Sequence, residues 1–482
     1  MQGAGGVSKD VLSINGARVY RILLKKIVVT GDIPQKTVAK AAGKGANVAR
    51  RAIRKNTPVG DTGELRRGIV REGERSKYKG KKVYDLMFDP AKNDVFQKPI
   101  PAPGTKQGSH AKLSEEIKKH TSIPIATVGR ITEPWIADEL IANGKADICM
   151  IGRANLCDSE FANKAEKGMD NDIRPCIGCL RCLNGIMFGK RVACTINPSL
   201  EIENEDTLKL SNTKKKILVI GGGPAGMEAA YVAKKRGHHV VLCDQNEELG
   251  GLMRIASVPI AKQDLSKVTQ YMVRKLEETG VEIRLNCTVN KELLQNEFAD
   301  YEVIISNGAS PIVIQPFTSF KHWATADDIL GGKAFPGRKI VIIGGGSVGC
   351  ETADYLAPLV YDRLPRDRKV TVIEMAPEIM STETGAGRSL LVQRMMKKGI
   401  ELICSAKVEK VEEDKIYYSK DGEIHCIADA DTLIFAVGYR TDTTLADTLK
   451  ELQMPYHTIG DANNVGTIKD AIHAGYAIAK EL

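Results

Sequence analysis

The chain of 482 residues is long enough for about three domains, and its 43% hydrophobic residues and 45 glycines are ordinary for an α/β protein. No apolar run approaches the length of a membrane span, and the N-terminus lacks the apolar core of a signal peptide, which predicts a cytoplasmic protein without a membrane partner. The net charge of +9 is uneven, because residues 1–112 hold 24 Lys and Arg against 9 Asp and Glu, whereas the remainder holds 45 against 51. This asymmetry indicates parts of different origin.

Residues 1–112 form a basic segment without cysteine. Residues 36–55 are alanine-rich with interspersed basic residues and predict a helix, which Pro58 ends, and residues 58–70 and 81–89 predict strands. The helix and the sequence TPVGDTGELRRGI after it resemble the tail-completion, or head–tail joining, proteins of tailed phages over about residues 30–110. The alternative is a basic, solvated extension. A nucleic-acid partner is not expected, since aromatic residues are sparse and no nucleic-acid motif is present.

Residues 113–170 predict a helix, then strand–helix–strand, with a Gly-Arg pair at the tip of each strand. Glycine allows close approach of the backbone, and arginine offers a planar fork that matches phosphate. In (β/α)8 barrels the loops after strands 7 and 8 commonly bind phosphate. The alternative is a plain βαβ unit with surface arginines. The candidate phosphate-binding residues are Gly129, Arg130, Gly152 and Arg153.

Residues 171–213 contain four cysteines, of which three follow a C-x2-C-x2-C pattern and the fourth arrives eleven residues later. A short loop can wrap three thiolates around one side of a cubane, while the distant cysteine closes the fourth corner, so the spacing favours a [4Fe–4S] cluster. A structural zinc site is the main alternative, although such sites usually pair two separated C-x2-C knuckles. Redox-inert thiols are a third interpretation. The candidate ligands are Cys176, Cys179, Cys182 and Cys194.

Two dinucleotide-binding fingerprints follow, and each has a strand, a G-x-G-x-x-G turn, a helix and a second strand that ends in an acid. The glycines let a pyrophosphate approach the helix N-terminus, and the acid accepts hydrogen bonds from ribose hydroxyls. A carboxylate at the second acid favours NADH over NADPH, whose 2′-phosphate it would repel. The first fingerprint consists of Gly221, Gly223, Gly226 and Asp244, and the second of Gly344, Gly346, Gly349 and Glu374.

Beyond Cys194 no two cysteines stand close together, so thioredoxin-reductase-type disulfide chemistry is not expected. Each of the later cysteines, and Cys157 before the cluster segment, is interpreted as a small core residue. His473 has no metal-ligand spacing and is interpreted as structural. No catalytic residue can be assigned from the sequence.

The stretches TVGRI and IGRANLCDSEF and the cysteine segment resemble the old yellow enzyme-like family, in the subgroup of 2,4-dienoyl-CoA reductase and bile-acid-inducible enoate reductases. The resemblance runs from about residue 113 to 482. It implies that the two Gly-Arg pairs hold an FMN phosphate, that Gly251 and Asp461 belong to two FAD signatures, and that residues 306–311 and 435–442 are crossings between domains. Barrel strands 1 to 6 of the family are missing, which indicates a chimeric or rearranged gene and makes stable FMN binding doubtful.

We therefore expect an α/β protein with two Rossmann-like domains of disulfide-reductase-like topology, after an iron–sulfur segment, a truncated (β/α)8 barrel remnant and a small basic α+β segment. The predicted domains are 1–112, 113–170, 171–213, 214–325 plus 440–482 for FAD, and 326–439 for NAD(P)H. The resemblance implies an oxidoreductase in which electrons pass from NADH to FAD and then to the cluster. We expect a small-molecule substrate or electron acceptor and leave open a homo-oligomer. The alternatives are a phage assembly protein with a fused oxidoreductase, and an electron-input subunit whose barrel a partner supplies.

Overall fold

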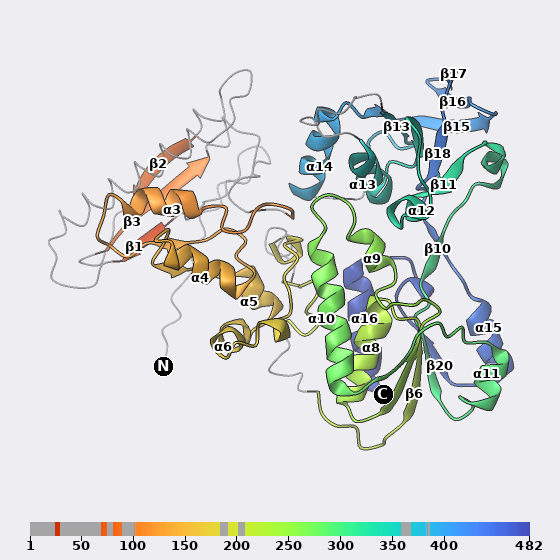
Figure 1. Ribbon diagram of the computed structural model, residues 1–482, viewed down its shortest axis with the longest axis horizontal. Helices are drawn as coiled ribbons and strands as arrows, with labels where there is room; N and C mark the ends of the chain where they lie inside the picture. Colours follow the sequence, from red (N-terminus) through yellow and green to blue (C-terminus); the bar gives the residue numbers. More distant parts are fainter. Residues whose placement is uncertain are drawn as a thin grey trace, which may run out of the picture. The chain divides into compact units, whose positions relative to one another are not determined.

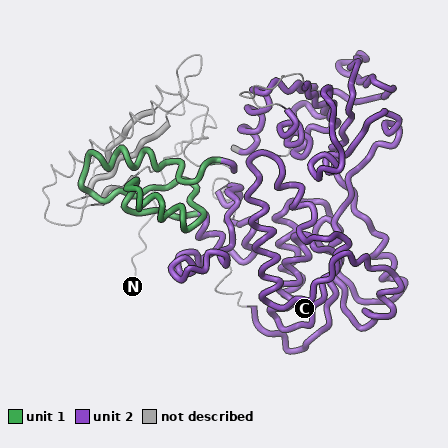
Figure 2. Tube along the Cα trace, viewed as in Figure 1, with its two compact units in different colours: residues 1–101, 105–152 green, residues 102–104, 153–482 purple. Residues whose placement is uncertain are grey.

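The computed structural model describes residues 101, 103–183, 191–200, 208–357, 368–381, 383 and 386–482, together with the backbone of three strands nearer the N-terminus. The chain divides into two compact units, one of residues 1–101 and 105–152 and the other of residues 102–104 and 153–482 (Figure 2). Among the described residues, no helix combines the length and the apolar character that crossing a membrane requires.

The basic segment contributes a three-stranded antiparallel sheet of order β1-β3-β2 to the first unit. Strand β3 falls on the predicted strand over residues 81–89, whereas β2 shares only residues 69 and 70 with the predicted strand over residues 58–70. The predicted helix over residues 36–55 lies outside the described residues. The strands are β1 (Lys25–Val28), β2 (Ile69–Glu74) and β3 (Lys81–Phe88).

The rest of the first unit is the predicted helix followed by strand–helix–strand, and its two strands pair in parallel. Both strands are only two residues long, which is shorter than the sequence predicts. After the first strand, Gly129 and Arg130 have φ of +129° and +57°, so the backbone leaves the extended region there and pairing stops. The elements are α3 (Ala111–Lys118), β4 (Ala126–Thr127), α4 (Pro134–Ala142) and β5 (Ile148–Cys149).

The second unit begins with short helices and the cysteine segment and continues into a five-stranded parallel sheet of order β20-β9-β6-β7-β8. The two central strands β6 and β7 each begin with an exposed basic residue or histidine and continue with four buried apolar residues, as a strand covered on both faces requires. Helices α8, α10 and α16 pack together (Figure 1). The elements are α5 (Arg153–Cys157), α6 (Phe161–Glu166), η1 (Asp170–Asp172), β6 (Lys216–Ile220), α8 (Pro224–Lys235), β7 (His239–Cys243), α9 (Leu252–Ala256), α10 (Asp264–Thr279), β8 (Glu282–Arg284), α11 (Lys291–Asn296), β9 (Glu302–Ile305), α15 (Thr444–Glu451), β20 (Tyr456–Thr458), η3 (Gly460–Ala462) and α16 (Ile468–Glu481).

A second five-stranded parallel sheet, of order β11-β18-β12-β13-β14, is inserted between β9 and β20 and carries a three-stranded antiparallel sheet. The chain enters and leaves this insertion through β10 and β19, which pair with each other, and they fall within the two predicted crossings. The elements are β10 (Ala309–Pro311), η2 (Gln315–Ser319), β11 (Trp323–Thr325), α12 (Ala326–Leu330), β12 (Lys339–Ile343), α13 (Ser347–Leu356), β13 (Lys369–Ile373), α14 (Ala386–Lys397), β14 (Glu401–Ile403), β15 (Ala406–Val411), β16 (Ile416–Lys420), β17 (Glu423–Ile427), β18 (Thr432–Phe435) and β19 (Tyr439–Thr441). Two Rossmann-like domains are thus confirmed.

Candidate functional site

The first glycine turn joins β6 to α8 and is shaped by close backbone contacts. Gly221 has φ of +107°, and a Cβ atom there would lie 2.3 Å from the carbonyl oxygen of Ser306. A Cβ atom at Gly226 would lie 1.9 Å from the carbonyl oxygen of Gly221. Around Gly223, by contrast, a Cβ atom would have no neighbour within 4 Å among the described residues. The first and third glycines therefore close the turn onto the sheet, while the second faces open space at the start of α8.

Asp244 stands directly after β7 and is 6% exposed. Its carboxylate accepts hydrogen bonds from the backbone N–H of Gly222 at 2.6 Å and from the backbone N–H of Asn246 at 2.7 Å. The acid predicted to bind ribose is therefore fixed beside the glycine turn by two backbone donors.

The second glycine turn, between β12 and α13, repeats this geometry. Gly344 has φ of +105°, and a Cβ atom at Gly349 would lie 2.0 Å from the carbonyl oxygen of Gly344. Gly346 again faces open space, since no atom of the part of the chain that the structure describes would lie within 4 Å of a Cβ atom added there. Glu374 follows β13, and its carboxylate accepts from the backbone N–H groups of Gly345 at 2.6 Å and Ala376 at 2.7 Å. The two turns are therefore structural repeats of one cradle.

Two further candidate FAD residues lie beside the first turn. Gly250 donates its backbone N–H to the carbonyl of Gly222 at 2.8 Å, and a Cβ atom at Gly251 would lie 3.1 Å from the Cα of Gly223. Asp461 lies in η3, where its carboxylate accepts from the backbone N–H of Gly466 at 2.9 Å and burial raises its pKa. Its neighbour Gly460 packs on α8, since a Cβ atom there would lie 2.9 Å from the Cβ of Ala225. The structure thus brings the three predicted FAD signatures to the same end of α8.

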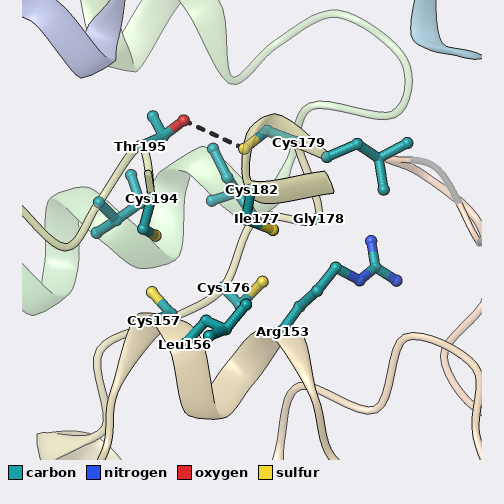
Figure 3. Close-up of a pocket in the computed structure, with 12 residues that line it drawn as sticks. Arg153, Leu156, Cys157, Cys176, Ile177, Gly178, Cys179, Cys182, Cys194 and Thr195 are labelled. Carbon is teal, nitrogen blue, oxygen red and sulfur yellow. Dashed lines mark hydrogen bonds between the residues drawn. The ribbon is translucent and has the colours of Figure 1, made fainter. Parts of the chain in front are cut away.

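The four candidate cluster cysteines line one cavity of the second unit, with about 310 Å³ of space between atoms, part of it open to solvent (Figure 3). All eleven cysteines are free thiols. Among the described residues, no three Cys, His, Asp or Glu side chains are gathered as they would be around a single metal ion. A fifth thiol, from Cys157 at the end of α5, and the side chain of Arg153 also line the cavity. Four thiols around a shared cavity are a donor set that fits an iron–sulfur cluster.

The thiols differ in their surroundings. Burial raises the pKa of Cys176 to about 11, whereas a hydrogen bond from Cys157 lowers the pKa of Cys194 to about 6. The same bond, together with burial, raises the pKa of Cys157 well above its ordinary value. Backbone N–H groups of Ile196 and Asn197 also hydrogen-bond to Cys194 and lower its pKa further. These surroundings favour the thiolate form of Cys194, which is the form that binds metal.

The cysteine segment packs against the apolar core beneath the first nucleotide cradle. Cys176 and Cys194 pack against the apolar cluster that contains residues of α8 and α16. His473 of α16 hydrogen-bonds through Nε2 to the carbonyl of Cys194 at 2.8 Å. Glu228 of α8 is buried, which raises its pKa to about 7, while the charge of Arg174 acts in the opposite direction. The four-cysteine cavity and the first cradle therefore pack on the same apolar core.

The four candidate FMN-phosphate residues are divided between the two units. Gly129, Arg130 and Gly152 belong to the first unit, and Arg153 belongs to the second, where it lines the cysteine cavity. Arg130 is 8% exposed and donates from Nη1 to the carbonyl of Thr105. A Cβ atom at Gly129 would lie 2.7 Å from the Oγ of Ser109, so the loop before α3 packs directly on this turn.

Sequence reasoning missed the roles of Cys157, Arg153 and His473 at the cysteine cavity. Each is brought there by tertiary packing from another element, and none has a spacing to the cysteines that marks it. It also missed Arg388 of α14, which donates to the carboxylate of Glu378 at 2.7 Å and to the carbonyl of Ile379 at 2.9 Å. This places a cation beside the loop that follows Glu374.

Three protein families match different parts of the chain. Residues 197–310 and 292–464 match the pyridine nucleotide-disulphide oxidoreductase family, and residues 88–172 match the NADH:flavin oxidoreductase / NADH oxidase family. Residues 23–98 match the bacteriophage HK97-gp10 tail-component family. These matches confirm both resemblances that the sequence indicates, to old yellow enzyme-like oxidoreductases and to phage tail proteins.

Two relatives are similar over most of the chain. The NADH oxidase of Thermoanaerobacter brockii is 36% identical over 78% of this chain and 58% of its own length. The bilirubin reductase of Mediterraneibacter gnavus is 35% identical over 80% of this chain and 59% of its own length. The solved structure of a 2-naphthoyl-CoA reductase has a TM-score of 0.73 and 25% identity, covering 78% of this chain and 57% of that one. The chain thus spans less than two thirds of each of these proteins. The match to the pyridine nucleotide-disulphide oxidoreductase family extends over more than half of this chain, and the chain therefore belongs to that family.

Proposed function

We propose that the chain is an NADH-dependent oxidoreductase that holds FAD and a [4Fe–4S] cluster and delivers electrons to a small-molecule acceptor. The observation that carries this proposal is the four-thiol cavity packed on the core of the first nucleotide cradle, with a second cradle in the same unit. When bound, the flavin accepts hydride from a nicotinamide and the cluster carries single electrons. The chain's own part is to fix these groups in place.

Each cofactor has its own set of candidate residues in this proposal. The cluster would be held by the four thiols of Cys176, Cys179, Cys182 and Cys194. FAD would lie on residues 214–325 plus 440–482, and NADH on residues 326–439. The FAD residues are Gly221, Gly223, Gly226, Asp244, Gly251 and Asp461, and the NADH residues are Gly344, Gly346, Gly349 and Glu374.

The acceptor is proposed to be a small molecule. The relatives include a bilirubin reductase and a cinnamate reductase, whose names support an acceptor of this kind. Measuring iron, acid-labile sulfide and FAD in the purified protein tests the proposal. About four iron, four sulfide and one FAD per chain are expected. Stoichiometric zinc without labile sulfide would exclude the proposed iron–sulfur cluster.

A second candidate function is phage head–tail assembly, with the oxidoreductase part as a fused passenger. The match of residues 23–98 to a phage tail-component family favours it. Electron microscopy of the purified protein separates the two functions. A colourless protein that assembles into rings would support assembly, whereas a yellow-brown protein that NADH bleaches would support the oxidoreductase.

We expect the purified protein to retain FAD and to lack stable FMN. The two strands β4 and β5 are the part of the barrel that the first unit provides, and two parallel strands cannot enclose an isoalloxazine ring. Arg130 is moreover engaged with the carbonyl of Thr105. Reduction of enoates or enoyl-CoA should be absent, while NADH-driven reduction of one-electron dyes persists. Chromatography of the extracted flavins measures this, and equal amounts of FMN and FAD would refute the expectation.

NADH is expected to be preferred over NADPH because of Glu374. A carboxylate at this position would face the 2′-phosphate of NADPH, and repulsion at about 4 Å is worth roughly 1–4 kcal/mol, which is roughly tenfold and upward in affinity. Arg388 is the described cation nearest in sequence after the strand, and it is already bonded to Glu378 and Ile379. The measurement is kcat/KM for both nucleotides with a dye acceptor.

The matched variants for this prediction are Glu374→Ser and Arg388→Lys. The serine variant should reduce the difference in kcat/KM between NADH and NADPH. It removes the repulsion between the carboxylate and the 2′-phosphate and keeps the fold. The lysine variant keeps the positive charge beside Glu378 and should leave the preference for NADH in place. A wild-type preference for NADPH would show that a cation, and not Glu374, determines which ribose is bound.

A further inference from the structure

Asn197 is a buried amide that follows the fourth candidate cluster cysteine by three residues. Its side chain is 4% exposed, and both of its polar atoms are hydrogen-bonded. Oδ1 accepts from Nη1 of Arg174 at 2.7 Å, and from the backbone N–H and the hydroxyl of Ser199 at 3.1 Å and 2.9 Å. Nδ2 donates to the carbonyl of Leu156 at 3.2 Å. A buried amide with these bonds joins its own segment to two others.

The segments that Asn197 joins are those around the candidate cluster ligands. Arg174 stands two residues before Cys176, which begins the C-x2-C-x2-C pattern. Leu156 belongs to α5 and lines the four-cysteine cavity (Figure 3). Asn197 therefore connects the first group of three cysteines, the distant Cys194 and one wall of the cavity.

Arg174, the partner of Asn197, is itself fixed at a second point. Its backbone N–H donates to Oδ2 of Asp158 at 2.8 Å, directly after α5. Asp158 is 8% exposed and forms an ion pair with Lys164 at 2.6 Å. Because the backbone and the side chain of Arg174 are both bonded, its hydrogen bond to Asn197 fixes Asn197 relative to α5.

The fourth candidate ligand needs such a connection because eleven residues separate Cys194 from Cys182. A connection of this length allows many positions for the last thiol, and confining it beside the other three costs conformational entropy. When the residues on either side of the cysteine segment are bonded to each other, much of that ordering takes place during folding. A site that is ordered before its ligand arrives binds that ligand more tightly.

We propose that Asn197 is a positioning residue that sets Cys194 against the other three candidate ligands, so that the four thiols are arranged before a cluster binds. The proposal rests on the proposed function, because it concerns a cluster on these cysteines. Asn197 itself binds no iron and acts through Arg174 and through the backbone that leads to Cys194.

The alternative role for Asn197 is general stabilisation of the folded unit. In that role it would only provide a partner for the buried guanidinium of Arg174. Iron would then be lost in proportion to the loss of stability, whichever part of the unit was weakened. The positioning role predicts instead that iron is lost faster only when the bonds of Asn197 are removed.

The experiment compares the full-length wild-type chain with Asn197→Ala and Asn197→Asp. Alanine removes all the side-chain hydrogen bonds, whereas aspartate keeps the oxygen that accepts from Arg174 and Ser199 and loses only the donor to Leu156. Each protein is reconstituted anaerobically with iron and sulfide, and release of iron to a ferrous chelator is followed by absorbance. Flavin content and thermal unfolding are measured on the same samples.

Asn290→Ala is the matched control for stability. Asn290 is the N-cap of α11 in the same unit, and its side chain accepts from the backbone N–H of Leu293 at 2.9 Å. Loss of an N-cap lowers the stability of the fold. Among the described residues, those that line the four-cysteine cavity do not include Asn290, so this variant weakens the unit at another place.

We expect Asn197→Ala to retain FAD and to release iron about tenfold faster than the wild type or more. Loss of a residue that orients metal ligands typically weakens metal binding by about ten- to a hundredfold. Asn197→Asp should release iron at a rate closer to that of the wild type than to that of the alanine variant. Asn290→Ala should unfold at a lower temperature and release iron at the wild-type rate.

An unchanged rate of iron release in Asn197→Ala would overturn the proposal. So would equally fast release from Asn290→Ala, an aspartate variant that behaves like the alanine variant, or loss of FAD together with iron in Asn197→Ala. Failure of the proposed function is distinct, because the reconstituted wild-type protein would then contain neither iron nor labile sulfide.

Discussion

Replacing Cys182 with serine is expected to remove the broad visible absorbance of the cluster and to leave the FAD spectrum intact. Cys182 lines the cavity with the other three candidate ligands, and a hydroxyl is a poor substitute for a thiolate at iron. The FAD candidates lie on a separate cradle around α8, which this substitution does not touch. Absorbance spectra with iron, sulfide and flavin analyses measure the effect.

The matched control is Cys426→Ser, at an exposed cysteine on β17. It should keep the full visible spectrum and the iron content of the wild type. If Cys182→Ser retained four iron and four sulfide, Cys182 would not be a ligand. If the FAD disappeared together with the cluster, the cavity and the cradle could not be loaded independently.

Gly223→Ala is expected to abolish the binding of FAD, and Gly346→Ala is expected to weaken the binding of NADH. A Cβ atom at either position would have no described residue within 4 Å, so both variants should fold. The added methyl group would, however, occupy the space through which a pyrophosphate approaches the helix N-terminus. Gly223→Ala should therefore be purified without FAD. Gly346→Ala should retain FAD and show a KM for NADH raised by about tenfold or more.

The matched substitutions are Gly226→Ala and Gly349→Ala. Their Cβ atoms would lie 1.9 Å and 2.0 Å from the carbonyl oxygens of Gly221 and Gly344, so the turn itself must move. These variants should lose thermal stability, whereas the first pair should unfold at the wild-type temperature. If Gly346→Ala lost FAD, or if Gly223→Ala kept it, the two cradles would not have the separate nucleotides assigned to them.

The nucleotide-binding half of the fold could be predicted from the sequence because its signals are local. The glycine spacing, the strand before it and the acid after the next strand all depend on residues within one βαβ unit, and both units have this form in the structure. Helix α16 begins at Ile468, where Thr467 and Asp470 form a capping box.

The surroundings of the cysteines could not be predicted, because they depend on contacts between distant segments. His473 lies 279 residues from Cys194, and no spacing rule connects them. Cys157 could be recognised only after α5 was placed at the cavity. The short length of β4 could not be predicted either, because the stretch from Ile123 to Ile131 is apolar enough for a longer strand. In the structure, the positive φ angles of Gly129 and Arg130 end the strand early.

Anaerobic addition of NADH to the purified wild-type protein tests the central proposal most directly. Flavin absorbance and the electron paramagnetic resonance signal of a reduced cluster are followed in the same sample. We expect NADH to bleach the flavin and a reduced iron–sulfur signal then to develop without any added mediator. A protein that contains both groups but whose cluster stays oxidised after the flavin is bleached, or a colourless protein that NADH does not change, would contradict the proposed electron path.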